Sequence, residues 1–162
     1  MSESILLTEG VSREERYQEL LPQIKAVIAD ESDWVANLAN ISAMLKEALG
    51  FLWVGFYRRD GEELVLGPFQ GPLACTRIAW GRGVCGTAAA RKETILVPNV
   101  EEFPGHIACS SLSKSEIVVP LVQDGQTELI LDVDSDQLDD FSEVDARYLE
   151  ELMAMIPYRR VS

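Results

Sequence analysis

Apolar residues recur at spacings of three and four in the first fifty residues, which is the periodicity of amphipathic helices. One helix is expected over residues 12–29, where Ser12 and Glu15 fit a capping box. A second helix is expected to open at Ser32 or Asp33 and to stop at Gly50. The residues expected on the buried faces are Tyr17, Leu20, Leu21, Ile24, Val27 and Ile28 in the first helix, and Trp34, Val35, Leu38, Ile41, Leu45 and Leu49 in the second.

After residue 50 the pattern changes to short runs rich in β-branched and aromatic residues, which predict strands. The expected strands cover residues 51–58, 63–69, 74–80, 94–97, 115–122 and 128–133. Asp-Gly dipeptides lie between two pairs of these runs, at residues 60–61 and 124–125, and each predicts a hairpin. Hairpins favour an antiparallel sheet.

Three further segments complete the expected fold. The alanine-rich residues 87–91 predict a short helix, and residues 98–108, which have two prolines and no periodicity, predict a long surface loop that often carries function. A last helix is expected to be capped within residues 141–145 and to end before Pro157. The sequence therefore predicts an α+β domain, in which a central antiparallel sheet of five or six strands is flanked by N- and C-terminal helices.

Length and charge narrow the classes of function. A chain of 162 residues and 18.0 kDa fits a single domain over residues 1–162, with residues 1–11 as a loose N-terminal segment. Lys and Arg number 14 against 27 Asp and Glu, and the net charge of −13 repels nucleic-acid phosphates and anionic lipid. The sequence has no signal-peptide pattern and no apolar run that could span a membrane. We therefore expect a cytoplasmic protein without nucleic-acid or membrane partners.

The cysteines Cys75, Cys85 and Cys109 are the first candidates for chemistry. An odd number of cysteines in a compartment that keeps thiols reduced argues against a structural disulfide framework. Because there is no C-x-x-C pair and His106 is the one histidine, the spacing predicts no zinc-finger site, whereas a site that folding assembles from the three thiols and His106 stays open. Cysteines are often small buried hydrophobic residues. Cys75 and Cys109, however, border expected loops, where solvent or a second thiol can reach them.

Carboxylates form a second group of candidates. Asp132 and Asp134 stand two positions apart in an expected strand, so both project to one face. Held close, they raise the proton affinity of one member or bind a cation such as an ammonium group, whereas a solvated strand end is the simpler interpretation. Glu116 is a single acid in an apolar strand and needs a partner. Trp53 and Tyr57 either pack in the core or form the wall of a pocket.

The glycine-rich residues 81–86 spell G-x-G-x-x-G, but no parallel-sheet pattern surrounds them. They are therefore a weak signal for dinucleotide binding. A glycine-rich turn into a short helix does expose backbone N–H groups that suit a substrate carboxylate.

Six motifs together resemble one family, the free methionine-(R)-sulfoxide reductases, which are GAF-domain enzymes. The motifs lie at residues 71–78, 81–89, 97–100, 103–109, 115–120 and 131–135, and they contain the three cysteines and the three acids named above. The resemblance covers nearly the whole chain. It implies a GAF fold around a small pocket, and an oxidoreductase linked to oxidative stress that reduces free L-methionine-(R)-sulfoxide to L-methionine.

The resemblance also implies roles for the site residues. Cys109 is the nucleophile that becomes a sulfenic acid, Cys75 resolves it as an intramolecular disulfide, and Cys85 takes part in recycling. The residues implied to hold the substrate and to shape its pocket are Glu116, Asp132, Asp134, Trp53 and Tyr57. Thioredoxin is the implied external reductant, no bound cofactor is implied, and homodimers are common among GAF domains.

Two assignments stay open at this point. Cys85 is an alternative nucleophile and an alternative resolving thiol, and any of the three acids is a candidate proton donor. A different class of function is also open, because GAF domains bind small ligands and a thiol pair can act as a redox sensor without turnover. Turnover of methionine sulfoxide distinguishes these alternatives.

Overall fold

The computed structural model describes residues 4–107 and 109–158, so Ala108 of the expected loop and the two chain ends lie outside the described residues. The helices are α1 (Arg13–Ile28), α2 (Trp34–Leu49), α3 (Gly83–Arg91), the short 3₁₀ helix η1 (Val100–Glu102) and α4 (Glu143–Met155). The strands are β1 (Trp53–Asp60), β2 (Glu63–Gln70), β3 (Arg77–Ala79), β4 (Ile95–Val97), β5 (Ser115–Gln123) and β6 (Gln126–Ser135).

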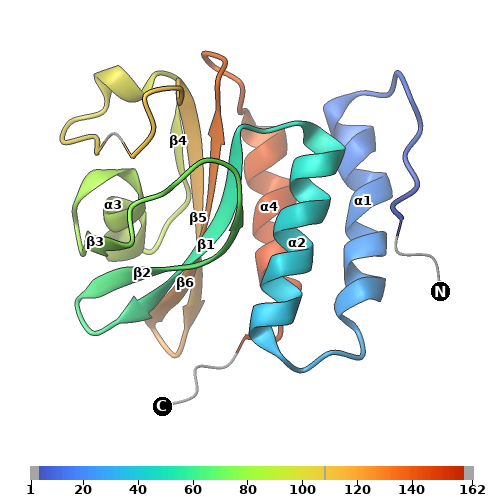
Figure 1. Ribbon diagram of the computed structural model, residues 1–162, viewed down its shortest axis with the longest axis horizontal. Helices are drawn as coiled ribbons and strands as arrows, with labels where there is room; N and C mark the ends of the chain where they lie inside the picture. Colours follow the sequence, from blue (N-terminus) through green and yellow to red (C-terminus); the bar gives the residue numbers. More distant parts are fainter. Residues whose placement is uncertain (1–3, 108, 159–162) are drawn as a thin grey trace.

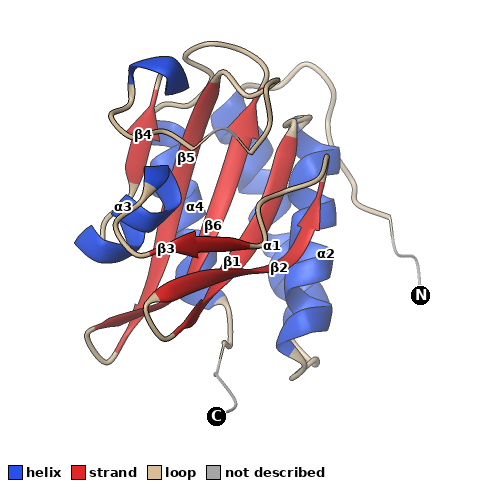
Figure 2. Cartoon of the chain, turned by 60° about the vertical axis from the view of Figure 1, so that its left-hand side comes forward, coloured by secondary structure: helices blue, strands red, loops and turns tan. Residues whose placement is uncertain are grey.

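Within the described residues, six strands form one sheet in the order β3-β2-β1-β6-β5-β4, and every neighbouring pair is antiparallel. Helices α1, α2 and α4 cover one face, whereas α3 and the segment after β4 lie on the other (Figures 1 and 2). The expected α+β fold with an antiparallel sheet is confirmed. No helix among the residues described is long and apolar enough to cross a membrane.

Local signals set the ends of the helices and the hairpins. The Ser12 side chain accepts a hydrogen bond from the backbone of Glu15 at the start of α1, and Asp33 caps α2 in the same way. Gly50 ends α2 with φ of 70°, a left-handed conformation that glycine adopts without strain. Asp124 and Gly125 both have positive φ, 51° and 77°, as a tight hairpin between β5 and β6 requires.

The two faces of the sheet bury different sets of side chains. On the helical face the alternate residues Val54, Phe56, Ile117 and Val133 pack against α1, α2 and α4 in the main core. On the opposite face Trp53 and Tyr57, together with residues of α3, belong to a second cluster of buried residues. The period-two alternation along the strands therefore separates a purely structural face from a face that holds other chemistry.

Some local expectations were wrong. Val27 and Val35, expected on buried helix faces, are 44% and 48% exposed, because the buried stripe of each helix is narrower than its apolar pattern. The strand expected over residues 74–80 is confined to Arg77–Ala79, since the Cys75 carbonyl accepts a hydrogen bond from the Tyr57 hydroxyl and Cys75 is tied into a disulfide. Residues 74–76 therefore form a loop.

The helix expected over residues 87–91 begins earlier, at Gly83. The glycines of the preceding turn permit close backbone packing: Gly81 N–H donates to the Gly86 carbonyl at 2.9 Å, and a Cβ on Gly86 would lie 2.5 Å from the Ala79 carbonyl oxygen. As a result Cys85 lies in the first turn of α3 rather than in the loop before it.

Candidate active site

Sheet register places the acidic and aromatic candidates next to one another. Asp134 on β6 pairs with Trp53 on β1 and with Glu116 on β5, so these three side chains form one row across the central strands. Asp132 lies in the adjacent row on the same face, and Tyr57 lies further along β1. The spacing of two between the aspartates therefore has the predicted effect, because both point away from the main core.

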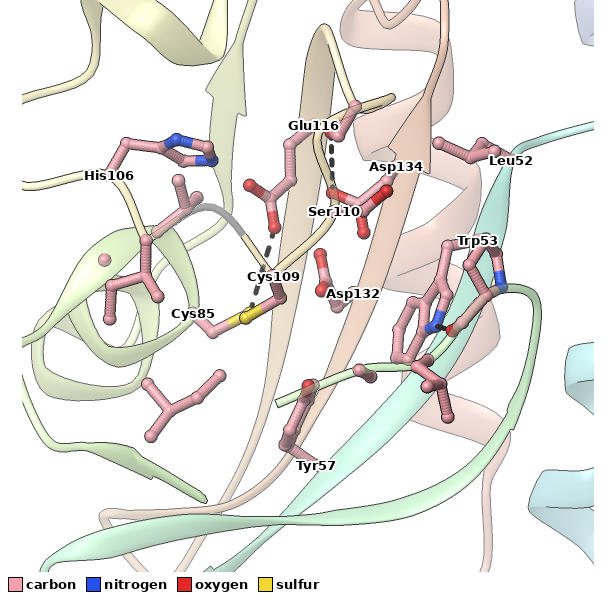
Figure 3. A pocket seen from close by; sticks show the side chains of 18 of the residues that line it. Leu52, Trp53, Tyr57, Cys85, His106, Cys109, Ser110, Glu116, Asp132 and Asp134 are labelled. Carbon is pink, nitrogen blue, oxygen red and sulfur yellow. Dashed lines mark hydrogen bonds between the residues drawn. The ribbon is translucent and has the colours of Figure 1, made fainter. Parts of the chain in front are cut away.

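These side chains form the floor of a pocket that is covered by α3 and by loops (Figure 3). The pocket is lined by side chains of β1, α3, β5 and β6 and by the loops before β3 and β5, and it opens to solvent. Glu116 and Asp132 are each only 6% exposed, so the acids are not a solvated strand end. All eight predicted site residues except Cys75 line this pocket, and Cys75 is bonded to Cys109, which does.

An aromatic wall closes one side of the pocket. The Trp53 ring lies between Tyr57 and Phe69, with centroid distances of 6.0 and 5.2 Å. Gly55, between the two β1 aromatics, leaves room for this wall, because a Cβ there would lie 2.6 Å from the Trp53 ring. The Trp53 indole N–H donates to the Pro72 carbonyl at 3.1 Å. It thereby fixes the loop that leads to Cys75.

Cys75 and Cys109 form a disulfide, with their Cα atoms 5.5 Å apart and a separation of 34 positions in sequence. Both residues lie in loops: Cys109 follows the expected loop, whereas Cys75 was expected near the start of a strand. The Tyr57 hydroxyl donates to the Cys75 carbonyl at 2.9 Å, so the aromatic wall also holds one end of the disulfide. The pairing joins the two thiols that the family resemblance assigns to attack and resolution.

Cys85 is the free cysteine of the three and is buried. Its Sγ lies 3.9 Å from Glu116 Oε2. Burial, followed by the charges of Asp132 and Glu116, raises the pKa of this thiol well above its usual value. Because the thiolate is the reactive form, these surroundings make Cys85 a poor nucleophile at neutral pH.

The three carboxyl groups hold protons more tightly than isolated acids do. Burial and then the charge of Asp132 raise the pKa of both Glu116 and Asp134 well above the usual values. Burial also raises the pKa of Asp132, although interactions with Glu116, Cys85 and Asp134 oppose the effect. The cluster therefore keeps acid protons at a higher pH than exposed carboxyls would, which suits proton donation.

Three other polar residues also line the pocket. His106 is half-buried in the wall, where burial lowers the pKa of its imidazole. Ser113 donates to Asp134 at 3.3 Å and Arg82 also lines the pocket, and neither was predicted as a site residue. Arg82 belongs to the motif at residues 81–89, which is recognised from the sequence alone. Ser113 lies between two motifs, in irregular sequence that does not indicate a site residue.

A metal ion could be held by one group of side chains among the described residues, namely Cys85, Glu116 and Asp132. The group is assembled by folding, from α3, β5 and β6, and matches none of the sequence spacings that are typical of metal sites. A group of three thiols with His106 is not formed, because two of the thiols are joined in the disulfide.

The fold and the pocket define the class of protein. A sheet covered by helices on one face, with a small-molecule pocket on the other, agrees with the GAF-domain family, whose sequence model matches residues 32–156. The matched segment includes the sheet, the three cysteines and the three acids.

Relatives narrow the class further. The free methionine-R-sulfoxide reductase of Escherichia coli (strain K12) is 45% identical over 147 residues, which cover 90% of this chain and 89% of that protein. GAF domain-containing protein A of Dictyostelium discoideum is 56% identical over 96% of this chain and 99% of that protein. The X-ray structure of the Neisseria meningitidis free methionine-R-sulfoxide reductase in complex with its substrate superposes with a TM-score of 0.93, at 55% identity, and covers 96% of this chain and 94% of that one. The chain belongs to the free methionine-R-sulfoxide reductase family.

Proposed function

We propose that this protein reduces free methionine-R-sulfoxide to methionine by means of the Cys75–Cys109 thiol pair. Family membership supports the substrate. One geometric observation carries the chemistry: a disulfide stands at a pocket whose floor holds three carboxyl groups. Nucleophile, acid and binding space are thus present in one enclosed site.

In the first half of the reaction the Cys109 thiolate attacks the sulfoxide sulfur, which forms a sulfur–sulfur bond, while a carboxyl of the cluster protonates the sulfoxide oxygen. The protonated oxygen then passes to the Cys109 sulfur as both the sulfur–sulfur bond and the sulfur–oxygen bond of the substrate break. Methionine leaves with its sulfur reduced by two electrons, and Cys109 is oxidised to the sulfenic acid. Glu116, Asp132 and Asp134 are the candidate donors, because each has a raised pKa and lines the pocket.

In the second half the Cys75 thiol attacks the sulfenic sulfur, and water leaves as the disulfide forms. An external dithiol then reduces the disulfide by thiol exchange, which restores both thiols and completes the transfer of two electrons. We propose thioredoxin for this role and no bound cofactor. Cys85 remains a thiol through the first half of the reaction. Its proposed role is in the later reduction of the disulfide.

Recognition of the free amino acid follows from charge. A carboxylate cluster pairs with an α-ammonium group, which methionine sulfoxide loses once it is joined into a polypeptide. Trp53 and Tyr57 supply an apolar wall suited to the methyl and methylene groups.

The test is a coupled assay with thioredoxin, thioredoxin reductase and NADPH. Racemic methionine sulfoxide should consume NADPH and stop near half conversion, because one sulfoxide epimer is used. The N-acetylated sulfoxide is the matched control and should react far more slowly, since it lacks the ammonium group. A ligand-binding or redox-sensing GAF module would give no turnover in this assay, and that result would reject the proposal.

Cysteine variants assign the thiols. Cys109→Ser should abolish turnover, since no thiolate remains to attack the sulfoxide. Cys75→Ser should release about one methionine per protein and then stop with thioredoxin as the reductant, because the sulfenic acid cannot be resolved. The measurement is methionine formed per protein over time. Full activity of the Cys109 variant would move the nucleophile to Cys85.

A further inference from the structure

Cys85, Glu116 and Asp132 converge at the bottom of the pocket from three different elements. One donor atom of each, the Cys85 Sγ and a carboxylate oxygen of each acid, lies within 4.8 Å of the other two. The residues are 5%, 6% and 6% exposed, so a ligand bound among them would be largely withdrawn from water. Figure 3 shows Glu116 and Asp132 directed into the space beside Cys85.

A second observation indicates that this cluster takes a ligand. Asp132 Oδ1 is buried and has no hydrogen-bond partner among the described residues. Nor do the ion pairs of the described chain include Glu116, Asp132 or Asp134. A buried carboxylate oxygen without a donor is costly, and a cation in the pocket would satisfy it.

The donor set selects the kind of cation. Mg²⁺ and Ca²⁺ favour sites made only of oxygen ligands, whereas a thiolate with carboxylates suits Zn²⁺ or a similar thiophilic ion. Tetrahedral zinc with the usual bond lengths places its sulfur and oxygen ligands about 3.6 Å apart. The Cys85 Sγ to Glu116 Oε2 distance is 3.9 Å, so small side-chain movements suffice. Three protein ligands leave one coordination position open toward the pocket.

We propose that the protein binds one Zn²⁺ ion through Cys85, Glu116 and Asp132, and that the bound ion blocks the pocket. Binding replaces the thiol proton of Cys85, which passes to solvent, by a zinc–sulfur bond. The ion occupies the carboxyl groups that would hold the substrate, so zinc and methionine sulfoxide exclude each other. This exclusion rests on the proposed function, whereas zinc binding itself does not.

The test uses Co²⁺ as a spectroscopic probe on the oxidised protein. Cys75 and Cys109 are then joined, so a thiolate-to-cobalt charge-transfer band can arise only from Cys85. We expect one equivalent of Co²⁺ to produce this band and one equivalent of Zn²⁺ to remove it.

Cys85→Ser should lose the band, and Asp132→Asn should weaken zinc binding by at least about tenfold, since even outer-shell changes cost that much. Asp136→Asn, an exposed acid beyond the pocket, is the matched control and should bind as the wild type does.

Competition between Co²⁺ and methionine sulfoxide is measured on the wild-type protein, so the result does not depend on whether a variant folds. Excess methionine sulfoxide should displace Co²⁺ and reduce the band. Absence of a thiolate band, or equal zinc affinity in the Cys85 and Asp132 variants, would overturn the site. A band that methionine sulfoxide leaves unchanged would overturn the exclusion. Turnover by chelator-treated protein tests the proposed function separately, so the two proposals fail in different measurements.

Discussion

Glu116 shows how a buried acid can serve chemistry at the expense of stability. The residue is only 6% exposed and lies near the start of β5, opposite Asp134 and close to Asp132. Burial and the charge of Asp132 raise its pKa well above 4.5 in the folded protein, whereas the unfolded chain restores the usual value. As the pH rises above 4.5, ionisation therefore favours the unfolded chain, and stability falls until the folded-state pKa is reached.

Glu116→Gln should remove this penalty. We expect the variant to have a higher melting temperature than the wild type at neutral pH, with the difference shrinking toward pH 4.5, and to lose activity because the acid is gone. Thermal unfolding at both pH values measures the effect. Glu101→Gln, an exposed acid, is the control. A melting-temperature difference that does not change with pH would contradict this account.

At the scale of elements, the β5–β6 pair determines which acids meet. From the hairpin turn the register runs Gln123 opposite Gln126 and Val122 opposite Thr127, and then shifts by one residue before Leu121. Without that bulge Glu116 would lie opposite Val133 and face the main core. With it, Glu116 lies opposite Asp134 and joins the carboxyl cluster.

The loop that carries Cys75 is a second case in which elements position chemistry, because the aromatic residues of β1 hold it. Tyr57→Phe removes the hydroxyl that donates to the Cys75 carbonyl at 2.9 Å but keeps the ring. We expect disulfide formation after one turnover to slow by up to about tenfold, as the loss of one hydrogen bond allows. Rapid-quench measurement of methionine and of free thiols separates the two steps. An equal loss in both steps would show that Tyr57 acts on the substrate instead.

These elements also show what could be predicted from the sequence. Helix caps, apolar periodicity and Asp-Gly turns are local, so the helices, the hairpins and the α+β class followed from them. The shared face of Asp132 and Asp134 followed from their spacing. The partner of Glu116 did not, because it depends on a bulge that no residue type marks. The early start of α3 could not be predicted either. Glycine normally disfavours a helix, and here Gly86 is needed for close packing against Ala79, which only the folded structure shows.

At the scale of the whole molecule, the proposed catalytic cycle alternates between a cross-linked and an open chain. The disulfide closes a loop of 34 positions and ties the segment before β3 to the segment before β5. Loop closure of this size removes entropy from the unfolded chain that corresponds to about 2–4 kcal/mol of stability. The form that accepts substrate is therefore expected to be the less stable one.

Reduction should consequently lower the free energy of unfolding of the wild type by about 2–4 kcal/mol. Urea denaturation with and without dithiothreitol measures the difference. Cys75→Ser should resemble the reduced wild type and should not respond to dithiothreitol, because it cannot form the cross-link, while Cys85→Ser should respond as the wild type does. Equal midpoints for oxidised and reduced wild type would contradict this account of the cross-link.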